Sequence, residues 1–400
     1  EEFIAAKHNS HKLMGFNVSV GVTDEFMVCL DANIPFQLTY DGKVYKEVDP
    51  VNLWDMIMRS TWDYAEPGIL FIDRMNEMNN LHYVEKLEAT NPCAEQPLPP
   101  FGACLLGSFN LVKYVDMEKQ KFDFEQFDSD IRCVVRAMDN VVDRTIYPLQ
   151  EQKLEATSKR RMGLGVTGLA NAGEMLGRSY ASDGFMEFME DVLCELRNTA
   201  YDASADLAKE KGPFPLWNHN KYGRSKFIQR LPQEIQDKIE VTGIRNSHLT
   251  SIAPTGTISL TADNVSGGIE PPFALFYDRT ITGFDGQQIE RVEDFAYSLG
   301  IKGRTANEIS VDDHLRVLIM ASQYVDSAVS KTCNVGDEVT YDEFKDVYYK
   351  AWKGGCKGIT TFRAAGKRYG VLNEVKPEND NQPKAEACFI NNETGKKECD

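Results

Sequence analysis

The sequence contains no long apolar run, no signal peptide and no transit peptide. We therefore expect neither a membrane-spanning nor an exported protein, and the cytoplasm is the expected compartment. Regular cysteine spacing is also missing, although nine cysteines are present. A disulfide framework is not expected, and the composition fits a reducing compartment in which a few thiols react and the others pack.

Positive charge is in short supply. Lys and Arg total 44 against 61 Asp and Glu, which gives a formal net charge of −17. This balance argues against a surface that grips a nucleic acid backbone, so a nucleotide ligand should bind in a local pocket. With 42% hydrophobic and 26% charged residues, the 400-residue chain has an ordinary globular composition and is long enough for two or three domains.

The segment 91–100 carries the clearest chemical signal. Its four prolines exclude a regular helix and predict an extended loop. Alternate side chains of an extended backbone share a face, so Asn91, Cys93 and Glu95 are expected to point the same way. The alternative is that Cys93 is one more buried cysteine that packs as a small apolar residue.

This arrangement suits one kind of thiol chemistry better than another. A carboxylate beside a thiol raises the thiol pKa by like-charge repulsion, so Glu95 would disfavour a Cys93 thiolate nucleophile. The pair instead suits a thiol that loses a hydrogen atom, while the carboxylate and the Asn91 amide act on substrate hydroxyls.

Two adjoining stretches carry a family resemblance. Asn-Pro-Cys-Ala-Glu-Gln-Pro-Leu-Pro-Pro at 91–100 and Gly-Ala-Cys-Leu-Leu-Gly-Ser-Phe-Asn-Leu at 102–111 resemble the finger loop of ribonucleotide reductases. The residues of these two stretches are most similar to those of the class II, adenosylcobalamin-dependent group. The resemblance implies reduction of ribonucleotides, with the enzyme's radical started by adenosylcobalamin.

The same resemblance assigns roles to four side chains. It implies that Cys93 carries a thiyl radical and that Glu95 takes the proton of the 3′ hydroxyl. Asn91 would hold the substrate by hydrogen bonding. Cys104 would be half of the dithiol that supplies the reducing electrons, with a partner that is not convincingly present among the other cysteines.

The resemblance extends from Phe16 to Leu372 and implies an α/β fold. The expected architecture is the ten-stranded α/β barrel of the reductases, with two five-stranded parallel halves running oppositely and the finger loop near 91–104. Residues 1–372 would form a partial barrel without its N-terminal part, and 373–400 a flexible tail. The start at 1–7 lacks Met and a capping residue and reads as the inside of a helix, so we expect a longer polypeptide.

A second chemical stretch is Ser251–Leu260. Apolar residues lead into a glycine flanked by hydroxyls, a pattern typical of a strand that ends in an anion-binding turn. An ordinary turn with self-satisfied hydroxyls is the alternative. Resemblance to the reductase loop that holds the substrate phosphates favours the former and nominates Pro254, Thr255, Gly256, Thr257, Ile258 and Ser259. Ser266–Pro271 resembles a neighbouring barrel segment.

The Gly-x-Gly-x-x-Gly string at 163–168 invites a dinucleotide-binding interpretation. No convincing βαβ unit with a ribose-binding acid follows it, so we predict that these glycines serve close strand and helix packing. Hydrophobic spacing also predicts helices at 52–65, 124–142 and 184–212.

Other local patterns complete the secondary-structure prediction. Strands are expected at 16–20 and 69–72, and Asp-Gly predicts a hairpin at 39–45. Four further cysteines should pack in the interior, namely Cys133, Cys194, Cys333 and Cys356. No metal site is predicted from Cys333 and Cys356, because neither has a partner at short ligand spacing.

The resemblance also implies regulation and electron delivery. The segment before the Phe16 strand would communicate between effector and substrate base; its candidates are Lys7, His8, Asn9, Ser10, His11 and Lys12. In the tail, Cys388 and Cys399 would pass electrons to the active-site disulfide. The implied partners are a ribonucleotide, deoxynucleotide or ATP effectors and a thioredoxin-like reductant, with a homodimer left open.

Two other functions stay open on the sequence. One is the large subunit of a class I reductase, which receives its radical from a second protein through a tyrosine pair. Tyr348-Tyr349 is such a pair, but it lies in a helix-like run ahead of Trp352 that does not match that context. The other is a non-catalytic nucleotide-binding fragment. Whether the substrate is a di- or a triphosphate is also open.

Overall fold

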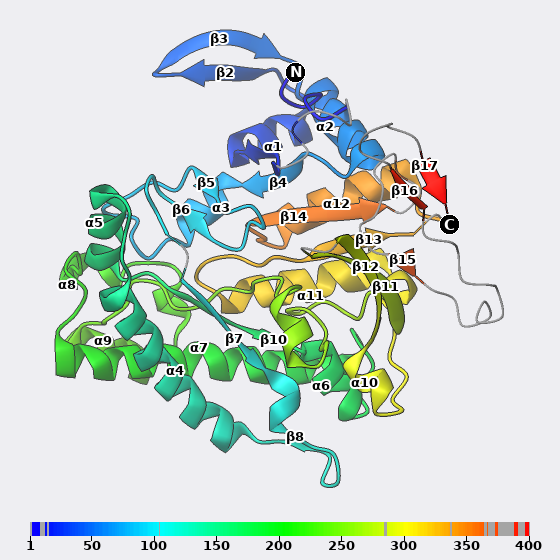
Figure 1. Ribbon diagram of the computed structural model, residues 1–400. Helices are drawn as coiled ribbons and strands as arrows, with labels where there is room; N and C mark the ends of the chain where they lie inside the picture. The colour runs from blue at the N-terminus through cyan, green and yellow to red at the C-terminus, as the bar shows by residue number, and fades with distance from the viewer. Residues whose placement is uncertain are drawn as a thin grey trace. The chain divides into compact units, whose positions relative to one another are not determined.

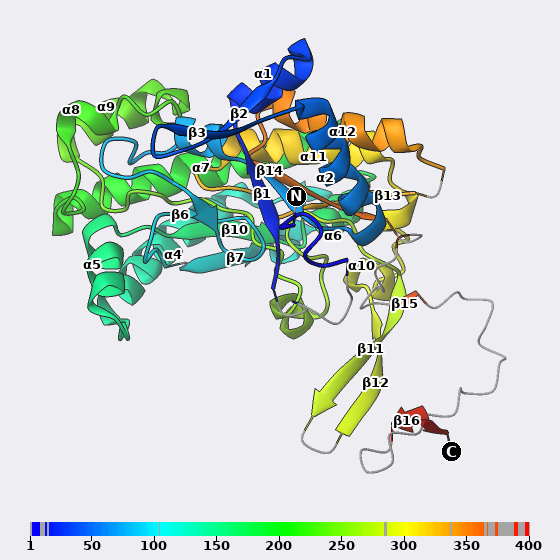
Figure 2. The same cartoon turned by 90° about the horizontal axis from the view of Figure 1, so that it is seen from above.

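A computed structural model describes residues 2–8, 13, 16–103, 105–283, 286–336, 338–363, 366, 373–374, 388–390 and 397–399. The chain divides into two compact units. The first comprises Glu1–Leu275 and Asp294–Gly370, and the second Phe276–Glu293 and Val371–Asp400. Two strands of the second unit, β11 (Phe276–Gly283) and β12 (Gly286–Glu293), form the antiparallel hairpin visible in Figure 2.

A four-stranded sheet lies in the first unit, in the order β1-β4-β14-β13. Its strands are β1 (Ser19–Val22), β4 (Gly68–Phe71), β14 (Gly358–Arg363) and β13 (Thr332–Val335). β1 and β4 are parallel to each other, β13 and β14 are parallel to each other, and β4 is antiparallel to β14. β4 is buried along its whole length, as its apolar sequence predicts.

A second run of parallel pairing consists of a separate two-stranded sheet and two isolated bridges. β7 (Leu106–Asn110) pairs with β10 (Gly163–Thr167), Leu164 bridges to Thr250, and Ile252 bridges to Val329, which leads into β13. Five segments, namely β7, β10, 250–252, 328–335 and β14, therefore run in one direction. β1 and β4 run in the other direction.

The expected ten-stranded barrel is seen only in part. The described residues form a mixed α/β structure with one five-membered parallel set and two opposing strands, and no sheet among them closes on itself. The opposite directions of the two sets agree with the expected halves, while the closed barrel itself stays a prediction.

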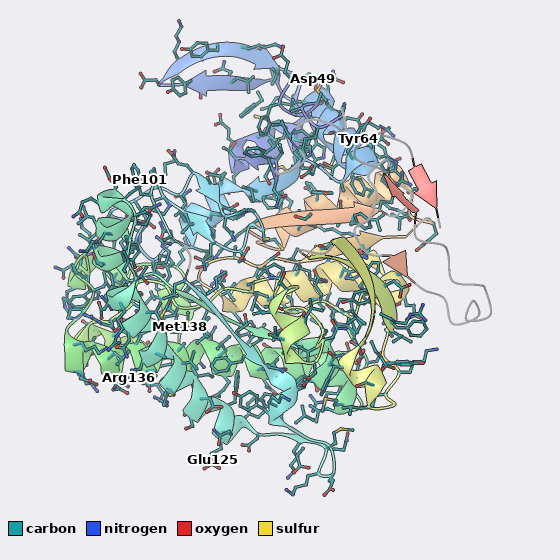
Figure 3. All side chains as sticks on the ribbon, in the orientation of Figure 1. Asp49, Tyr64, Phe101, Glu125, Arg136 and Met138 are labelled. Carbon is teal, nitrogen blue, oxygen red and sulfur yellow. The ribbon has the colours of Figure 1, made fainter. Side chains whose placement is uncertain are left out.

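Helices connect the parallel segments and cover them (Figure 1). α4 (Phe124–Arg144) and α7 (Asp183–Lys211) pack against each other, and α11 (Val311–Tyr324) packs on α7. On α4, Met138 is buried against the β7 side, whereas Glu125 and Arg136 are exposed (Figure 3). This is the apolar face predicted from the spacing of residues 127–142.

The remaining elements are short or peripheral. The helices are α1 (Asp24–Ala32), α2 (Pro50–Tyr64), α3 (Ile72–Glu77), α5 (Gln150–Lys159), α6 (Leu169–Met175), α8 (His219–Tyr222), α9 (Gln233–Thr242), α10 (Phe295–Ser298) and α12 (Tyr341–Lys353), with 3₁₀ turns at Leu111–Tyr114, Ile228–Arg230, Ile258–Ala262 and Ala306–Glu308. The strands are β2 (Phe36–Tyr40), β3 (Lys43–Val48), β5 (Ala89–Thr90), β6 (Pro97–Leu98), β8 (Val115–Asp116), β9 (Lys121–Phe122), β15 (Asn373–Glu374), β16 (Cys388–Ile390) and β17 (Lys397–Cys399).

Several local predictions are confirmed and two are wrong. The helices at 52–65, 124–142 and 184–212 correspond to α2, α4 and α7, and the Asp-Gly hairpin is β2–β3. Residues 2–7 form turns, not the inside of a helix. Cys133 is exposed on α4, because it falls outside the apolar stripe that buries Ile131 and Val135. Cys194 is partly buried.

Candidate active site

The finger loop is the tip of a short antiparallel hairpin. β5 pairs with β6, and the residues between them turn back. The Ala94 N–H donates to the Asn91 carbonyl oxygen over 3.0 Å, and Ala94 has a φ of 66°. The prediction of an extended loop is therefore wrong: Pro92 excludes a helix, but it is also compatible with the first central position of a turn. Alternation of side chains along a strand does not apply here.

Asn91 closes this turn with both its backbone and its side chain. Its N–H donates to the Gln96 carbonyl oxygen over 3.1 Å, and its Oδ1 accepts from the Gln96 N–H over 3.0 Å. Asn17, next to β1, adds a third tether by donating from Nδ2 to the Pro92 carbonyl oxygen over 2.8 Å. The side-chain oxygen of Asn91 thus holds the loop, which leaves its Nδ2 group as the donor for a ligand.

Cys93 occupies the exposed tip of the hairpin. Within the described residues, the alternative of a buried cysteine that packs as a small apolar residue is therefore wrong. Partial desolvation by neighbouring atoms, and after it the Glu95 carboxylate, raise the pKa of the Cys93 thiol above its ordinary value. The thiol therefore remains protonated at neutral pH, as expected for a hydrogen-atom donor and not for a thiolate nucleophile.

Glu95 is anchored by its backbone and has an unused side-chain oxygen. Its carbonyl oxygen accepts from the Ala328 N–H over 2.9 Å and from Ser251 Oγ over 2.8 Å. The residue is 2% exposed, and its Oε2 has no hydrogen-bond partner. Gln96, which follows, is also buried and its amide atoms are unpartnered. Buried polar atoms of this kind are normally satisfied, so the hairpin is suited to receiving a polar ligand.

A buried polar network that sequence reasoning missed lies next to Ser251 and Ala328, the residues that bond the Glu95 carbonyl oxygen. Asp326 accepts from the backbone N–H groups of Leu249 and Thr250 over 2.6 and 3.1 Å. Buried Lys357 donates to the Asp326 carbonyl oxygen over 2.6 Å. These bonds fix the segment that carries Ser251 beside the stretch that carries Ala328. No local sequence pattern marks them, because the partners are far apart in the chain.

The predicted phosphate loop is a turn that follows the segment 250–252, which forms two isolated β-bridges. Thr255 is buried with a φ of 51°, and its Oγ1 accepts from the Gly268 N–H over 2.7 Å and bonds Thr167 Oγ1 over 2.7 Å. The Ser259 N–H donates to the Thr255 carbonyl oxygen. Residues 256–258 are exposed, and a Cβ on the glycine at 256 would meet nothing within 4 Å. The loop thus offers open backbone, while its hydroxyl at 255 is structural.

The hairpin and the phosphate loop are connected through one segment. Ser251 bonds the Glu95 backbone, and the phosphate loop begins three residues later at Pro254. The glycines of the 163–168 string make this approach possible. A Cβ on Gly165 would lie 2.2 Å from the Ser251 carbonyl oxygen, and one on Gly163 would lie 2.2 Å from Gln96 Nε2. Close packing, as predicted, accounts for both glycines.

Two of the predicted specificity-loop residues are described. Lys7 pairs with Glu66 over 2.5 Å. The His8 ring stacks on Tyr64 with centroids 4.4 Å apart, and its Nε2 bonds Ser60 Oγ over 2.9 Å. These contacts tie the start of the segment to α2 and to Glu66 just after it, and are not contacts with the finger hairpin.

Other predicted residues lie outside the described part or have only a backbone description. Asn9, Ser10, His11, Lys12 and Cys104 lie outside the described residues. In the tail, β16 pairs with β17 so that residue 388 is opposite residue 399. The roles predicted for these residues stay predictions.

Cys333 and Cys356 are buried free cysteines, and burial raises the pKa of each thiol to about 12. They therefore behave as packing residues, as predicted. Within the described residues, no group of three or more His, Cys, Asp or Glu side chains could hold a metal ion. No helix in that part of the chain is long and apolar enough to cross a membrane.

Comparison with known proteins gives a consistent family. Residues 1–299 and 289–362 match the family model of the ribonucleotide reductase barrel domain. The chain is 33% identical to a vitamin B12-dependent ribonucleoside-diphosphate reductase of Thermoplasma acidophilum over 93% of this chain and 50% of that protein. A reductase of the same name from Mycobacterium tuberculosis H37Rv is 33% identical over 94% of this chain and 55% of its own length.

A vitamin B12-dependent ribonucleotide reductase of Streptomyces coelicolor is 27% identical over 87% of this chain and 42% of that protein. The chain spans about half the length of the curated relatives it matches. The family match covers most of the chain, including the finger hairpin and the strands around it. The chain belongs to the ribonucleotide reductase barrel-domain family.

Proposed function

We propose that this chain forms the catalytic part of a cobalamin-dependent ribonucleotide reductase that converts ribonucleotides to 2′-deoxyribonucleotides. The observation that carries the proposal is the chemistry of the finger hairpin. The Glu95 carboxylate helps to raise the pKa of the Cys93 thiol, which keeps the thiol protonated, and the Glu95 Oε2 atom has no hydrogen-bond partner. The relatives named above as vitamin B12-dependent support the same reaction class.

The proposed chemistry begins at the thiol. Cys93 gives up its hydrogen atom, and the resulting thiyl radical takes the hydrogen atom from C3′ of the ribose. Glu95 accepts the proton of the 3′ hydroxyl, and the free Nδ2 group of Asn91 donates a hydrogen bond to the substrate. The 2′ hydroxyl leaves as water, and a hydrogen atom returns from Cys93 to C3′.

Two electrons and two protons balance this step. Cys104 and a second thiol supply them, and the pair ends as a disulfide. One ribonucleotide and one dithiol therefore give one deoxyribonucleotide, one disulfide and one water. We assign Cys388 and Cys399 to reduction of that disulfide, with a thioredoxin-like protein as the external reductant.

The residues present fit a cobalamin cofactor because the thiol at the hairpin tip is exposed and protonated. When bound, adenosylcobalamin supplies the radical that starts the reaction. Cys93 is the residue that would meet it. The substrate phosphates would bind at 254–259, where backbone groups are open, and the names of two relatives favour diphosphates. Lys7–Lys12 would relay the effect of bound deoxynucleotides or ATP.

The test uses the full-length protein with adenosylcobalamin, a dithiol reductant and ribonucleoside diphosphates or triphosphates. Cys93→Ser should abolish deoxynucleotide formation, because the O–H bond of serine is much stronger than the S–H bond of cysteine and does not give up its hydrogen atom to form a radical. Cys133→Ser is the matched control, since Cys133 is an exposed thiol on α4 and should be dispensable. Retained activity in Cys93→Ser would overturn the mechanism, and turnover without cobalamin would point to a radical from a partner subunit.

A further inference from the structure

Two consecutive residues of the finger hairpin concentrate unsatisfied polar atoms. Within the described residues, six buried side-chain nitrogen or oxygen atoms lack a hydrogen-bond partner. Three of the six are Glu95 Oε2, Gln96 Oε1 and Gln96 Nε2. Burying a polar group without a partner is unfavourable, so such atoms usually face a ligand or an ordered water. Glu95 has a proposed role, whereas Gln96 has none.

The Gln96 backbone is fixed while its amide is not. Both backbone groups bond Asn91, at 3.0 and 3.1 Å, and the residue is only 1% exposed. The amide lies in a slot next to Gly163, where a Cβ would be 2.2 Å from Nε2. Leu106 Cδ2 and Ser251 Cβ are each 2.8 Å from the same point, so apolar atoms border the amide.

The chemistry of the missing partner follows from the amide. An amide has N–H donors and a carbonyl acceptor. A hydroxyl group is a small ligand group that can both accept a hydrogen bond from the amide N–H and donate one to the amide oxygen. The adjoining Glu95 Oε2 is an acceptor for a second hydroxyl. Neighbouring hydroxyls on one ligand are what a ribose offers.

We propose that Gln96 is a further substrate-binding residue, whose side-chain amide hydrogen bonds a ribose hydroxyl of the nucleotide. This inference rests on the proposed function. It gives a partner to a buried amide that has none within the described residues.

The test replaces the amide with a side chain of similar length and no polar atoms. In the full-length protein, Gln96→Met should leave the melting temperature of the nucleotide-free form unchanged or higher. It should raise KM for the ribonucleotide about tenfold, since roughly two neutral hydrogen bonds are lost. The rise in melting temperature caused by added ribonucleotide should shrink in parallel. Gln96→Leu, with less volume, should show the same pattern.

Gln236→Met is the matched control. The Gln236 Nε2 donates to the Leu231 carbonyl oxygen over 2.7 Å within the protein, so this variant should lower the melting temperature and leave KM unchanged. The inference is overturned if Gln96→Met keeps the wild-type KM, or if it loses stability as the control does, because the amide then serves water or the protein itself.

The two proposals fail in different ways. In one case the wild-type protein reduces no ribonucleotide, but added ribonucleotide raises its melting temperature more than that of Gln96→Met. This result would refute the reductase reaction and support the binding role of Gln96. An active wild-type protein whose substrate stabilises both forms equally would refute the role of Gln96 alone.

Discussion

At the scale of single residues, the thiol of Cys93 and the carboxylate of Glu95 carry the proposed chemistry. Cys93 and Glu95 could be paired from their spacing, and the carboxylate does raise the pKa of the thiol, although desolvation is the larger cause. The hydrogen bond of Ser251 to the Glu95 backbone and the approach of Gln96 to Gly163 could not be predicted, because these contacts join segments that are distant in sequence. The exposure of Cys133 was missed because a cysteine in a helix was expected to pack, although Cys133 falls outside the stripe that buries Ile131 and Val135.

Glu174 on α6 gives a prediction at this scale. Burial, and after it the Asp294 carboxylate, raise the pKa of Glu174 to about 8. The Asn171 Nδ2 group donates to both carboxylates, at 3.4 Å to Glu174 and at 3.0 and 3.1 Å to Asp294. The folded protein therefore keeps a proton on Glu174 at a pH where the unfolded chain, with the ordinary value near 4.5, has lost it.

The sign follows from proton binding. Between about pH 4.5 and 8 the folded state binds more protons at this site, so stability falls as pH rises through this range. Glu174→Gln removes the titration, and its free energy of unfolding should exceed that of the wild type by a margin that grows with pH, on the order of a few kcal/mol by pH 8. Urea unfolding at pH 5, 6.5 and 8 measures this; a constant difference would contradict it.

At the scale of elements, periodic segments were predictable and the finger loop was not. The helices α2, α4 and α7 follow from hydrophobic spacing, because each buries one face along its length. In the finger loop the prolines correctly exclude a helix, but they are equally compatible with a turn. The φ of 66° at Ala94 has no sequence signal, since alanine rarely adopts it.

The packing of β10 against the segment 250–252 makes a second prediction. Gly165→Ala would place a Cβ 2.2 Å from the Ser251 carbonyl oxygen, a backbone atom that cannot move without shifting its segment. We expect a loss of roughly 1–3 kcal/mol of unfolding free energy from this overpacking. Chemical denaturation measures the loss.

Gly184→Ala is the control for this substitution. A Cβ at that position of α7 meets nothing within 4 Å, so alanine should be neutral or stabilise the helix by about 0.5–1 kcal/mol. Equal effects of the two substitutions would show that close approach to Ser251 is not limiting.

At the scale of the whole molecule, the order of the strands is what the sequence could least provide. A family resemblance implied two parallel halves of opposite direction, and the described strands fall into such sets. The pairings that join them, Leu164 with Thr250 and Ile252 with Val329, are isolated bridges without a local signature. Tyr348 and Tyr349 lie in α12, as the helical pattern there indicated. Their hydroxyl groups form hydrogen bonds with Thr361 and Asp31, respectively.

Unequal burial predicts unequal local stability. β10 is buried at every residue, whereas the β2–β3 hairpin is exposed at nearly every position. A two-stranded hairpin without an apolar face is marginal by itself, so it should open far more often than the core strands. Hydrogen exchange followed by mass spectrometry should show fast exchange at 36–48 and slow exchange at 163–167. Similar protection in both would contradict this.

The hydrogen bond from Ser251 Oγ to the Glu95 carbonyl oxygen joins the segment 250–252 to the finger hairpin. This segment is fixed at one end to the residue proposed to take the 3′ proton, and it runs into the loop proposed to hold the phosphates. If both roles hold, this segment sets a constant distance between the site for the ribose and the site for the phosphates. A nucleotide with the right sugar and base but an altered linkage to its phosphates could then bind either its phosphates or its ribose in the correct position, but not both.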